Sequence, residues 1–187
     1  NDHIRGRRII SGAGSGSPSS TFQTYPNENF FSSVSATEEL DDINGDGIND
    51  FAMVFPNLQK VEIYYGGQNI SQSPNQTVNT PYIPQGITSG EFTGDGTSDF
   101  LLIGSGPQGS VLDVYSGGAT VTNVKTITAS DFQTLNGGTV DQPMFMGISN
   151  IGDITGDGSD DFLVGSGRAG NTSGTTEYLN DAYIFYG

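Results

Sequence analysis

The chain has 187 residues and a formal net charge of −15, with six Lys and Arg residues against 21 Asp and Glu residues. Neutralising a phosphate backbone needs many basic side chains, so this composition excludes a general nucleic-acid-binding protein. The 28 Gly residues and the abundant Ser, Thr and Asn disfavour long helices and suit short strands joined by turns. No apolar run of about 18 residues occurs, so we expect no transmembrane segment.

The N-terminal segment, residues 1–30, is expected to be extended and to hold a degenerate partial repeat. Its apolar run Ile9–Gly14 predicts one strand, and Thr21–Tyr25 predicts a weaker one. Arg7 and Arg8 stand where the later repeats place acidic residues, so we expect no bound ion in this segment.

The loop Asp42–Asp50 follows, and it is the most informative stretch of the chain. It places side-chain oxygens at positions one, three, five and nine, with Gly at positions four and six. Hard cations such as Ca²⁺ take six to eight oxygen ligands, which alternate residues of a tight loop can direct to one point. The loop recurs at Glu91–Asp99 and Asp153–Asp161, with an acid at positions one, five and nine each time. Three copies in the same phase argue against a coincidental surface turn.

The three loops therefore predict three Ca²⁺ ions, which would offset part of the negative charge. Side chains at positions one, three, five and nine and the backbone carbonyl at position seven are the expected ligands. They are Asp42, Asn44, Asp46, Ile48 and Asp50 in the first loop, Glu91, Thr93, Asp95, Thr97 and Asp99 in the second, and Asp153, Thr155, Asp157, Ser159 and Asp161 in the third. An EF-hand is excluded because position twelve, which needs a bidentate Glu, holds Met53, Leu102 and Val164.

Each loop lies within a longer repeated pattern of strands. Short apolar runs follow position nine and predict second strands that are buried on both faces, at Phe51–Phe55, Phe100–Gly104 and Phe162–Gly165. First strands are expected before the loops, at Phe31–Ala36, Tyr82–Ser89 and Met144–Ile151, and alternating third strands at Val61–Gly66, Leu112–Gly117 and Ala182–Gly187. Polar stretches at 68–81 and Ala119–Ile127 could add outer fourth strands. Repeats of this size with four strands each are typical of β-propeller blades.

The pattern Asp-x-Asn-Gly-Asp-Gly-x-x-Asp-Phe, followed by an apolar strand and Val-x-Ile-Tyr-x-Gly, resembles the FG-GAP repeat of integrin α-subunit β-propellers. The resemblance implies that each loop joins the first two strands of a blade and holds Ca²⁺. Two features depart from the family. Glu91 is longer than the usual Asp, which would weaken binding, and the chain holds about three and a half blades where the family's propellers have about seven.

This frame divides the all-β chain into four parts: an N-terminal segment and three blades. The expected bounds are 1–30, then 31–81 with the first loop, 82–135 with the second, and 136–187 as an incomplete blade with the third. The blades could be open or completed by another chain, with closure as a four-bladed propeller and truncation of a longer propeller as the competing interpretations.

Several motifs point to no further chemistry. Gly104–Gly109 and Gly165–Gly170 match GxGxxG, but a dinucleotide site needs a helix after the motif and none is predicted. With no Cys and only His3, the usual activated nucleophiles and zinc sites are missing, so we expect no enzyme. Tyr64, Tyr65, Tyr115, Tyr183 and Tyr186 could form a sugar-binding surface, although blade packing is the simpler interpretation for most of them.

The sequence thus predicts a non-catalytic, extracellular or cell-surface calcium-binding protein that acts in adhesion or scaffolding through a protein or glycan ligand. Two alternatives remain open at this point. One is a homo-oligomer or filament subunit that assembles head to tail by strand complementation, and the other is a carbohydrate-binding module. Sequons at Asn69, Asn75 and Asn171 carry little weight in a chain so rich in Asn, Ser and Thr.

Overall fold

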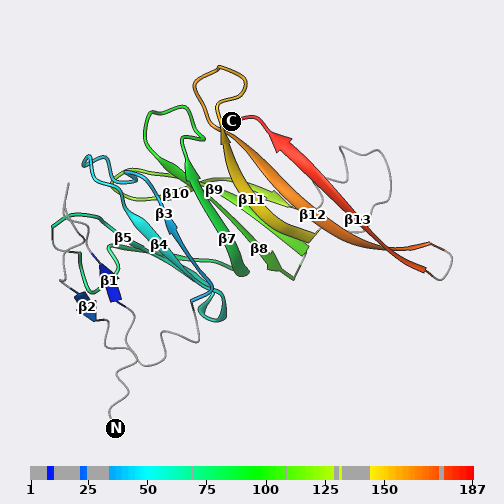
Figure 1. Cartoon of the computed structure of the whole chain (residues 1–187), viewed down its shortest axis with the longest axis horizontal. Helices are drawn as coiled ribbons and strands as arrows, with labels where there is room; N and C mark the ends of the chain where they lie inside the picture. Colours follow the sequence, from blue (N-terminus) through cyan, green and yellow to red (C-terminus); the bar gives the residue numbers. More distant parts are fainter. Residues whose placement is uncertain are drawn as a thin grey trace, which may run out of the picture.

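The computed structural model describes residues 8–10, 22–24, 34–68, 70–107, 109–128, 131, 144–172 and 175–187. These residues form three larger antiparallel sheets and one small strand pair (Figure 1). The predicted all-β, blade-like fold is confirmed. In the described part of the chain, no helix is long and apolar enough to cross a membrane.

Each larger sheet corresponds to one repeat, and its strands neighbour one another in chain order. The first repeat contains β3 (Ala36–Glu39), β4 (Phe51–Phe55), β5 (Lys60–Tyr64) and β6 (Gln76–Asn79), with the short 3₁₀ helix η2 (Pro56–Leu58) between β4 and β5. The second contains β7 (Ile83–Gly90), β8 (Asp99–Gly106), β9 (Gly109–Ser116) and β10 (Thr122–Thr128). The third contains β11 (Met144–Gly152), β12 (Asp161–Thr172) and β13 (Thr175–Phe185).

The small pair consists of β1 (Arg8–Ile10) and β2 (Phe22–Thr24), which are antiparallel and join none of the three repeat sheets. β2 falls within the predicted run Thr21–Tyr25, and β1 overlaps the predicted run Ile9–Gly14 at Ile9 and Ile10. The rest of the N-terminal segment lies outside the described residues.

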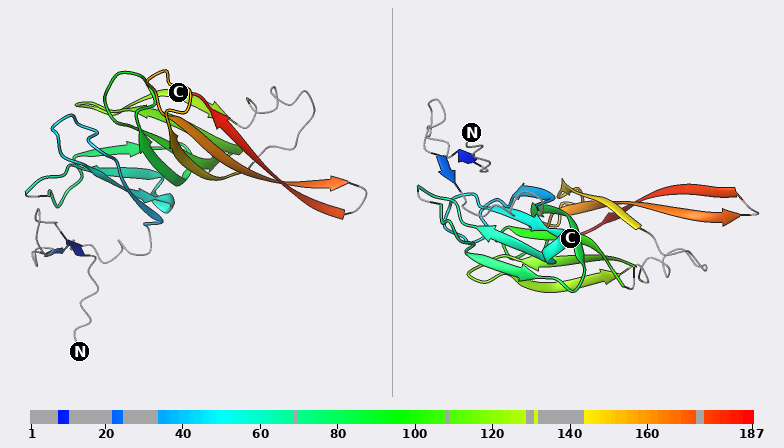
Figure 2. Two further views of the ribbon diagram at one scale, coloured as in Figure 1. Left: turned by 45° about the horizontal axis from the view of Figure 1, so that its top comes forward. Right: turned by 90° about the horizontal axis from the view of Figure 1, so that it is seen from below.

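Two predicted boundaries are wrong. The first strand of repeat one was expected at Phe31–Ala36, of which residues 31–33 lie outside the described part, but the strand that pairs with Phe51–Val54 is β3 at Ala36–Glu39. The second strand of repeat three was expected to end at Gly165. Instead β12 and β13 stay paired without interruption as far as Thr172 and Thr175. Figure 2 shows this long β12–β13 pair projecting beyond the other two sheets.

The sheets pack face to face through two shared cores, and β7 lies beside both β3 and β11. One face of the first sheet, which includes Ala52 and Ile63, packs against Phe100 and Leu102 of the second. The other face of the second sheet carries Leu101 and Val114, which pack against repeat three. The middle strand β8 is therefore buried on both faces, as its apolar sequence predicted.

The two glycine-rich motifs lie in strands and turns. Gly106 pairs with Gly109 where β8 turns into β9, and Gly165–Gly170 lies within β12. Among the described residues neither motif opens a helix, which a dinucleotide site needs after the motif.

Candidate metal centres

The three loops have the same backbone course. Glycines at positions four and six have φ between +72° and +101° in every copy. This left-handed region strains any residue with a Cβ, so the backbone conformation requires glycine, although at five of the six positions a Cβ would meet nothing within 4 Å. The residues are Gly45 and Gly47, Gly94 and Gly96, and Gly156 and Gly158.

The acid at position one closes each loop by accepting backbone hydrogen bonds. Oδ1 of Asp42 accepts from the N–H groups of Gly45 (2.8 Å) and Asp46 (2.9 Å), and Oδ2 accepts from Gly47 (2.7 Å). Asp153 accepts from the same three positions of its loop. Glu91 reaches positions three to five through Oε1 alone, so its longer side chain leaves position six unbonded in the described contacts.

The acid at position five caps the following turn in all three loops. Its Oδ1 accepts the N–H of position seven, at 2.9 Å for Asp46, 2.8 Å for Asp95 and 3.0 Å for Asp157. This hydrogen bond is the largest cause that lowers the pKa of Asp95. Hydrogen bonds from Gly158 and Gly156 likewise lower the pKa of Asp153.

The Asp at position nine ties the loop to the far end of the third strand. Its Oδ1 accepts an N–H from the glycine that ends the Tyr-x-Gly pattern or its equivalent, at 2.8 Å for Asp50, 2.9 Å for Asp99 and 3.1 Å for Asp161. The donors are Gly66, Gly117 and Gly187. The sequence showed that a glycine ends each third strand, but it did not indicate that the N–H of this glycine bonds to the Asp at position nine.

The same glycines pack directly on the loop backbone. A Cβ built on Gly117 would lie 2.0 Å from the carbonyl oxygen of Ser98, and one on Gly66 would lie 2.1 Å from that of Asn49. Both carbonyls belong to position eight of the loop. Only glycine therefore allows the third strand to approach the loop closely enough for the bond to position nine.

Asp50 differs from its counterparts in its second oxygen. Asp99 Oδ2 accepts the N–H of Phe92 at 2.9 Å, whereas the equivalent N–H in the first loop, that of Ile43, bonds to the Asp41 carbonyl. Oδ2 of Asp50 is buried and makes no hydrogen bond of ordinary geometry, although the N–H groups of Ile43 and Asn44 lie near enough to lower its pKa.

Burial is the main influence on two of the position-nine carboxylates. It raises the pKa of both Asp50 and Asp99 in spite of their backbone donors. Repulsion from the position-five acid, Asp46 or Asp95, raises the two pKa values further. A cation between positions five and nine would relieve both effects, so the donor types and the unpaired oxygen of Asp50 fit a hard cation such as Ca²⁺.

The predicted ligands are brought into the same loops but not to one point. Among the described residues, no three His, Cys, Asp or Glu side chains gather closely enough to hold a metal ion. Most of the acids at positions one and five instead face backbone N–H groups, as does Asn44, whose Oδ1 accepts from Asp46.

The sequence did not single out position two of the loop, whose side chain packs in the core between one repeat and the next. Ile43 is fully buried in the core shared with repeat two, and Phe92 is 6% exposed in the core shared with repeat three. The carbonyl of Ile43 also accepts the N–H of Gly118 at 2.8 Å. An apolar residue directly after the acid at position one was the signal available in the sequence.

In every repeat a stacked aromatic pair joins the second and third strands directly beside the loop. The first apolar residue after position nine stacks on an aromatic residue of the third strand, with ring planes 6–9° apart. The pairs are Phe51–Tyr64, Phe100–Tyr115 and Phe162–Phe185, with centroid distances of 5.1, 4.7 and 4.9 Å. Tyr64 and Tyr115 are therefore packing residues, whereas Tyr186 is 68% exposed.

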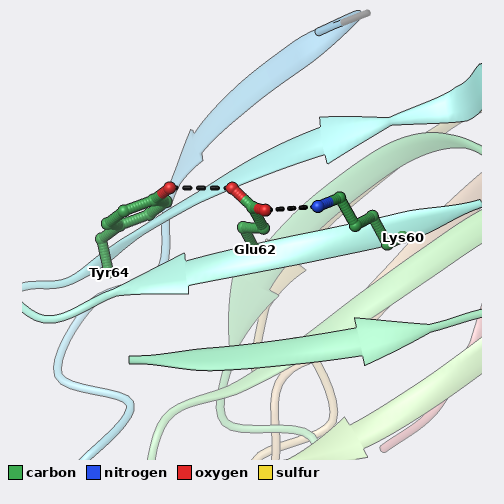
Figure 3. Close-up of polar contacts among 3 residues, drawn as sticks. All are labelled: Lys60, Glu62 and Tyr64. Atoms are coloured by element: carbon green, nitrogen blue, oxygen red, sulfur yellow. Dashed lines mark hydrogen bonds and ion pairs between the residues drawn. The ribbon is translucent and has the colours of Figure 1, made fainter. Parts of the chain in front are cut away.

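Two buried carboxylates outside the loops are held by hydrogen bonds. Glu62 accepts the hydroxyl of Tyr64 at 2.8 Å and pairs with Lys60 (Figure 3). At the equivalent place in repeat two, Asp113 accepts the hydroxyl of Tyr82 at 2.6 Å. Burial and the Asp113 carboxylate raise the pKa of Tyr82 far above its usual value. The Glu62 contacts order side chains along β5, whereas the Tyr82 contact joins the residue before β7 to β9.

Comparison with known families identifies the repeat. Residues 42–102 match the model of the FG-GAP-like repeat, a span that begins at the first loop, contains the second and ends within β8. No curated protein matches the chain. The position-nine bond, the paired glycines and the stacked aromatics recur at residues 153–187, outside the matched span. The chain therefore carries an FG-GAP-like repeat over residues 42–102.

Proposed function

We propose that this protein is a non-catalytic, extracellular calcium-binding scaffold of FG-GAP-like repeats that acts in adhesion at a surface. The observation that carries the proposal is the buried, unpaired Oδ2 of Asp50 within a loop of oxygen donors. A carboxylate oxygen that is removed from water without a partner is costly, and a bound cation offsets that cost.

In the first loop, Asp42, Asn44, Asp46 and Asp50 would hold the ion together with the Ile48 carbonyl. Bound Ca²⁺ would add positive charge among carboxylates that otherwise repel one another. Loops of this kind suit the millimolar Ca²⁺ found outside cells, which supports an extracellular location. The rigid blades would then present their connecting loops to a protein or glycan ligand.

Calcium removal tests this proposal. A ligand present at 100 times its dissociation constant stabilises the folded state by about 2.7 kcal/mol per site, so chelation with EDTA should lower the melting temperature clearly. Calorimetric titration of the chelated protein with CaCl₂ should show saturable binding. An unchanged melting temperature and no binding heat would contradict the proposal.

The loops should differ in their contribution. Asp46→Ala should reduce the calcium-dependent rise in melting temperature more than Glu91→Ala, because the first loop has the most complete set of ligands. Both side chains lie at the protein surface or near it, so neither change disturbs a core. Equal losses in the two variants would argue against this ranking.

A self-assembling subunit is the second candidate function, and the outer face of repeat three favours it. Ile184 is 50% exposed and Ile154 is 56% exposed, whereas their equivalents Ile63 and Ile43 in repeat one are fully buried against the next repeat. Repeats one and two each cover this face with a neighbouring repeat, whereas none of the described sheets packs on it in repeat three, and a second copy could cover it.

A further inference from the structure

The end of the first strand makes the same contact with the preceding repeat at both joints between repeats. The Ser89 hydroxyl, near the end of β7, donates to the Glu39 carbonyl at the end of β3 over 2.9 Å. The side-chain amide of Asn150, near the end of β11, donates to the Ser89 carbonyl, also over 2.9 Å. These bonds lie directly before the loops, which follow one another along one side of the molecule (Figure 1). Each loop therefore begins close to the start of its neighbour.

The joint between repeats two and three has an additional connection through Asp160. This half-buried residue is at position eight of loop three and is not one of the expected ligands. Its Oδ2 accepts the backbone N–H of Glu91 at 3.1 Å, and its own N–H donates to the Glu91 carbonyl at 2.5 Å. The same Oδ2 accepts from the Asn150 amide at 2.8 Å. Asp160 thus bonds both backbone groups of the residue that opens loop two.

Gly90 shows how closely this contact is packed. A Cβ built on Gly90 would lie 2.4 Å from Nδ2 of Asn150 and 2.7 Å from Oδ2 of Asp160. Gly90 ends β7 and directly precedes Glu91. The lack of a side chain at this position is therefore what admits the two polar side chains of repeat three to the start of loop two.

Glu91 depends on this support more than an Asp would. Its Oε1 accepts the N–H groups of positions three, four and five, and the shortest of these bonds, to Gly94, measures 2.6 Å. A Glu side chain has one more rotatable bond than Asp, so it loses more conformational entropy when it closes the loop. Because Asp160 already fixes the backbone N–H and carbonyl of Glu91, only the side chain remains to be ordered.

Asp160 is placed in turn by its own loop. It lies between Ser159, whose carbonyl is the expected ligand at position seven, and Asp161, the expected ligand at position nine. Ca²⁺ in loop three would fix the residues on both sides of Asp160. The Asp160 carboxylate would then be held in the place where it accepts the N–H of Glu91.

We propose that Asp160 is a positioning residue for the calcium site of loop two, so that Ca²⁺ in loop three strengthens binding in loop two. The inference rests on the proposed calcium-binding function and adds a coupling between two of its sites. By linkage, Ca²⁺ in loop two must strengthen binding in loop three by the same factor. Loop one lacks this arrangement, because Ser98, at position eight of loop two, forms no hydrogen bond with loop one among the residues described.

Titration of the full chain with CaCl₂, followed by proton–nitrogen NMR, reads the three loops separately. The reporters are the amide signals of the position-six glycines Gly47, Gly96 and Gly158. Asp160→Ala should raise the CaCl₂ concentration that half-saturates the Gly96 signal about tenfold, because it removes the support of a ligand. The same change should leave the half-saturation of Gly47 as it is in the parent chain.

Asp160→Asn separates the hydrogen bond from the charge. Asn keeps an oxygen that can accept from Glu91 and Asn150, but it carries no charge. It should therefore leave the half-saturation of Gly96 close to that of the parent chain. Equal losses in Asp160→Ala and Asp160→Asn would overturn the positioning role, since the charge of Asp160 would then be its contribution.

The coupling itself is tested without any change at Asp160. Asp157→Ala, at an exposed position of loop three, should weaken calcium binding in loop three and raise the half-saturation concentration of Gly96 about fivefold. The matched control is Ser98→Ala, which alters position eight of loop two and should leave the half-saturation of Gly47 unchanged.

The outcomes separate this inference from the proposed function. If no loop glycine shifts with CaCl₂ in the parent chain, the proposed function fails and this inference fails with it. If all three shift, but neither Asp160→Ala nor Asp157→Ala moves the half-saturation of Gly96, the inference is overturned while calcium binding stands. Melting temperatures in EDTA check the fold of each variant, and Asp157→Ala decides the coupling if Asp160→Ala is unfolded.

Discussion

The position-nine carboxylates make different contacts in equivalent places of their loops. Both oxygens of Asp99 accept backbone N–H groups, so the side chain fastens its loop without any ion. Asp50 uses one oxygen for the Gly66 N–H, and its other oxygen has no such bond. The difference arises from a single backbone group, the N–H of Ile43, which bonds to the Asp41 carbonyl.

Substitution by Asn should separate these two roles. Without calcium, Asp99→Asn places an amide N–H₂ against one of two backbone donors and should lower the free energy of unfolding by about 1–3 kcal/mol. Asp50→Asn keeps an acceptor for Gly66 and removes a buried charge, so it should cost less than about 1 kcal/mol. In calcium, Asp50→Asn should lose the stabilisation that its loop receives from the ion.

Urea unfolding of both variants, with EDTA and with CaCl₂, measures the four values that the comparison needs. The prediction is wrong if Asp50→Asn is the more damaging change in EDTA.

At the scale of the element, the loop and the third strand form one unit. The glycine at the strand end, the carbonyl at position eight and the carboxylate at position nine are in contact in every repeat. The stacked aromatic pair holds the two strands in register directly beside this junction. Loop and strand therefore depend on each other for their geometry.

The glycine at the junction gives a direct prediction. Gly117→Ala should destabilise the protein by about 2 kcal/mol or more, because the added methyl group meets the backbone of Ser98, which cannot rotate away. Gly147→Ala is the control, since a Cβ there meets nothing within 4 Å and Gly147 also lies in a strand. Thermal unfolding in EDTA should show a large loss for the first change and a small one for the second.

Much of this element could be predicted from the sequence. The loop glycines, the second strands and the phase of the repeat follow from local pattern, because Gly and alternating acids have short-range causes. The Asp50–Gly66 bond and the burial of Ile43 could not be predicted, since each depends on a partner 16 or more residues away. The long pairing of β12 with β13 was missed for the same reason, because a polar run becomes a strand only when its partner aligns with it.

For the whole molecule, the residue at loop position two decides how repeats are joined. It is buried in a neighbouring repeat in two loops and lies exposed in the third. The same side chain is therefore expected to contribute much more to the free energy of unfolding at Ile43 than at Ile154.

Truncation of the two isoleucines makes this contrast measurable. Ile43→Ala should lower the free energy of unfolding by about 2–5 kcal/mol, because it empties a filled position in a shared core. Ile154→Ala should change it by about 0.5 kcal/mol or less in dilute protein, since 56% of the side chain already meets solvent. Similar losses in the two variants, measured by urea unfolding, would show that position two does not join the repeats.

The shared faces have a consequence for how such chains change over time. Every repeat presents one face with the aromatic pair and an opposite face with the position-two side chain, and the two faces fit each other. Duplication of one repeat within the gene therefore inserts a unit whose two interfaces are already complementary to its neighbours. The number of repeats can grow or shrink without the evolution of any new contact, while each unit keeps its own loop.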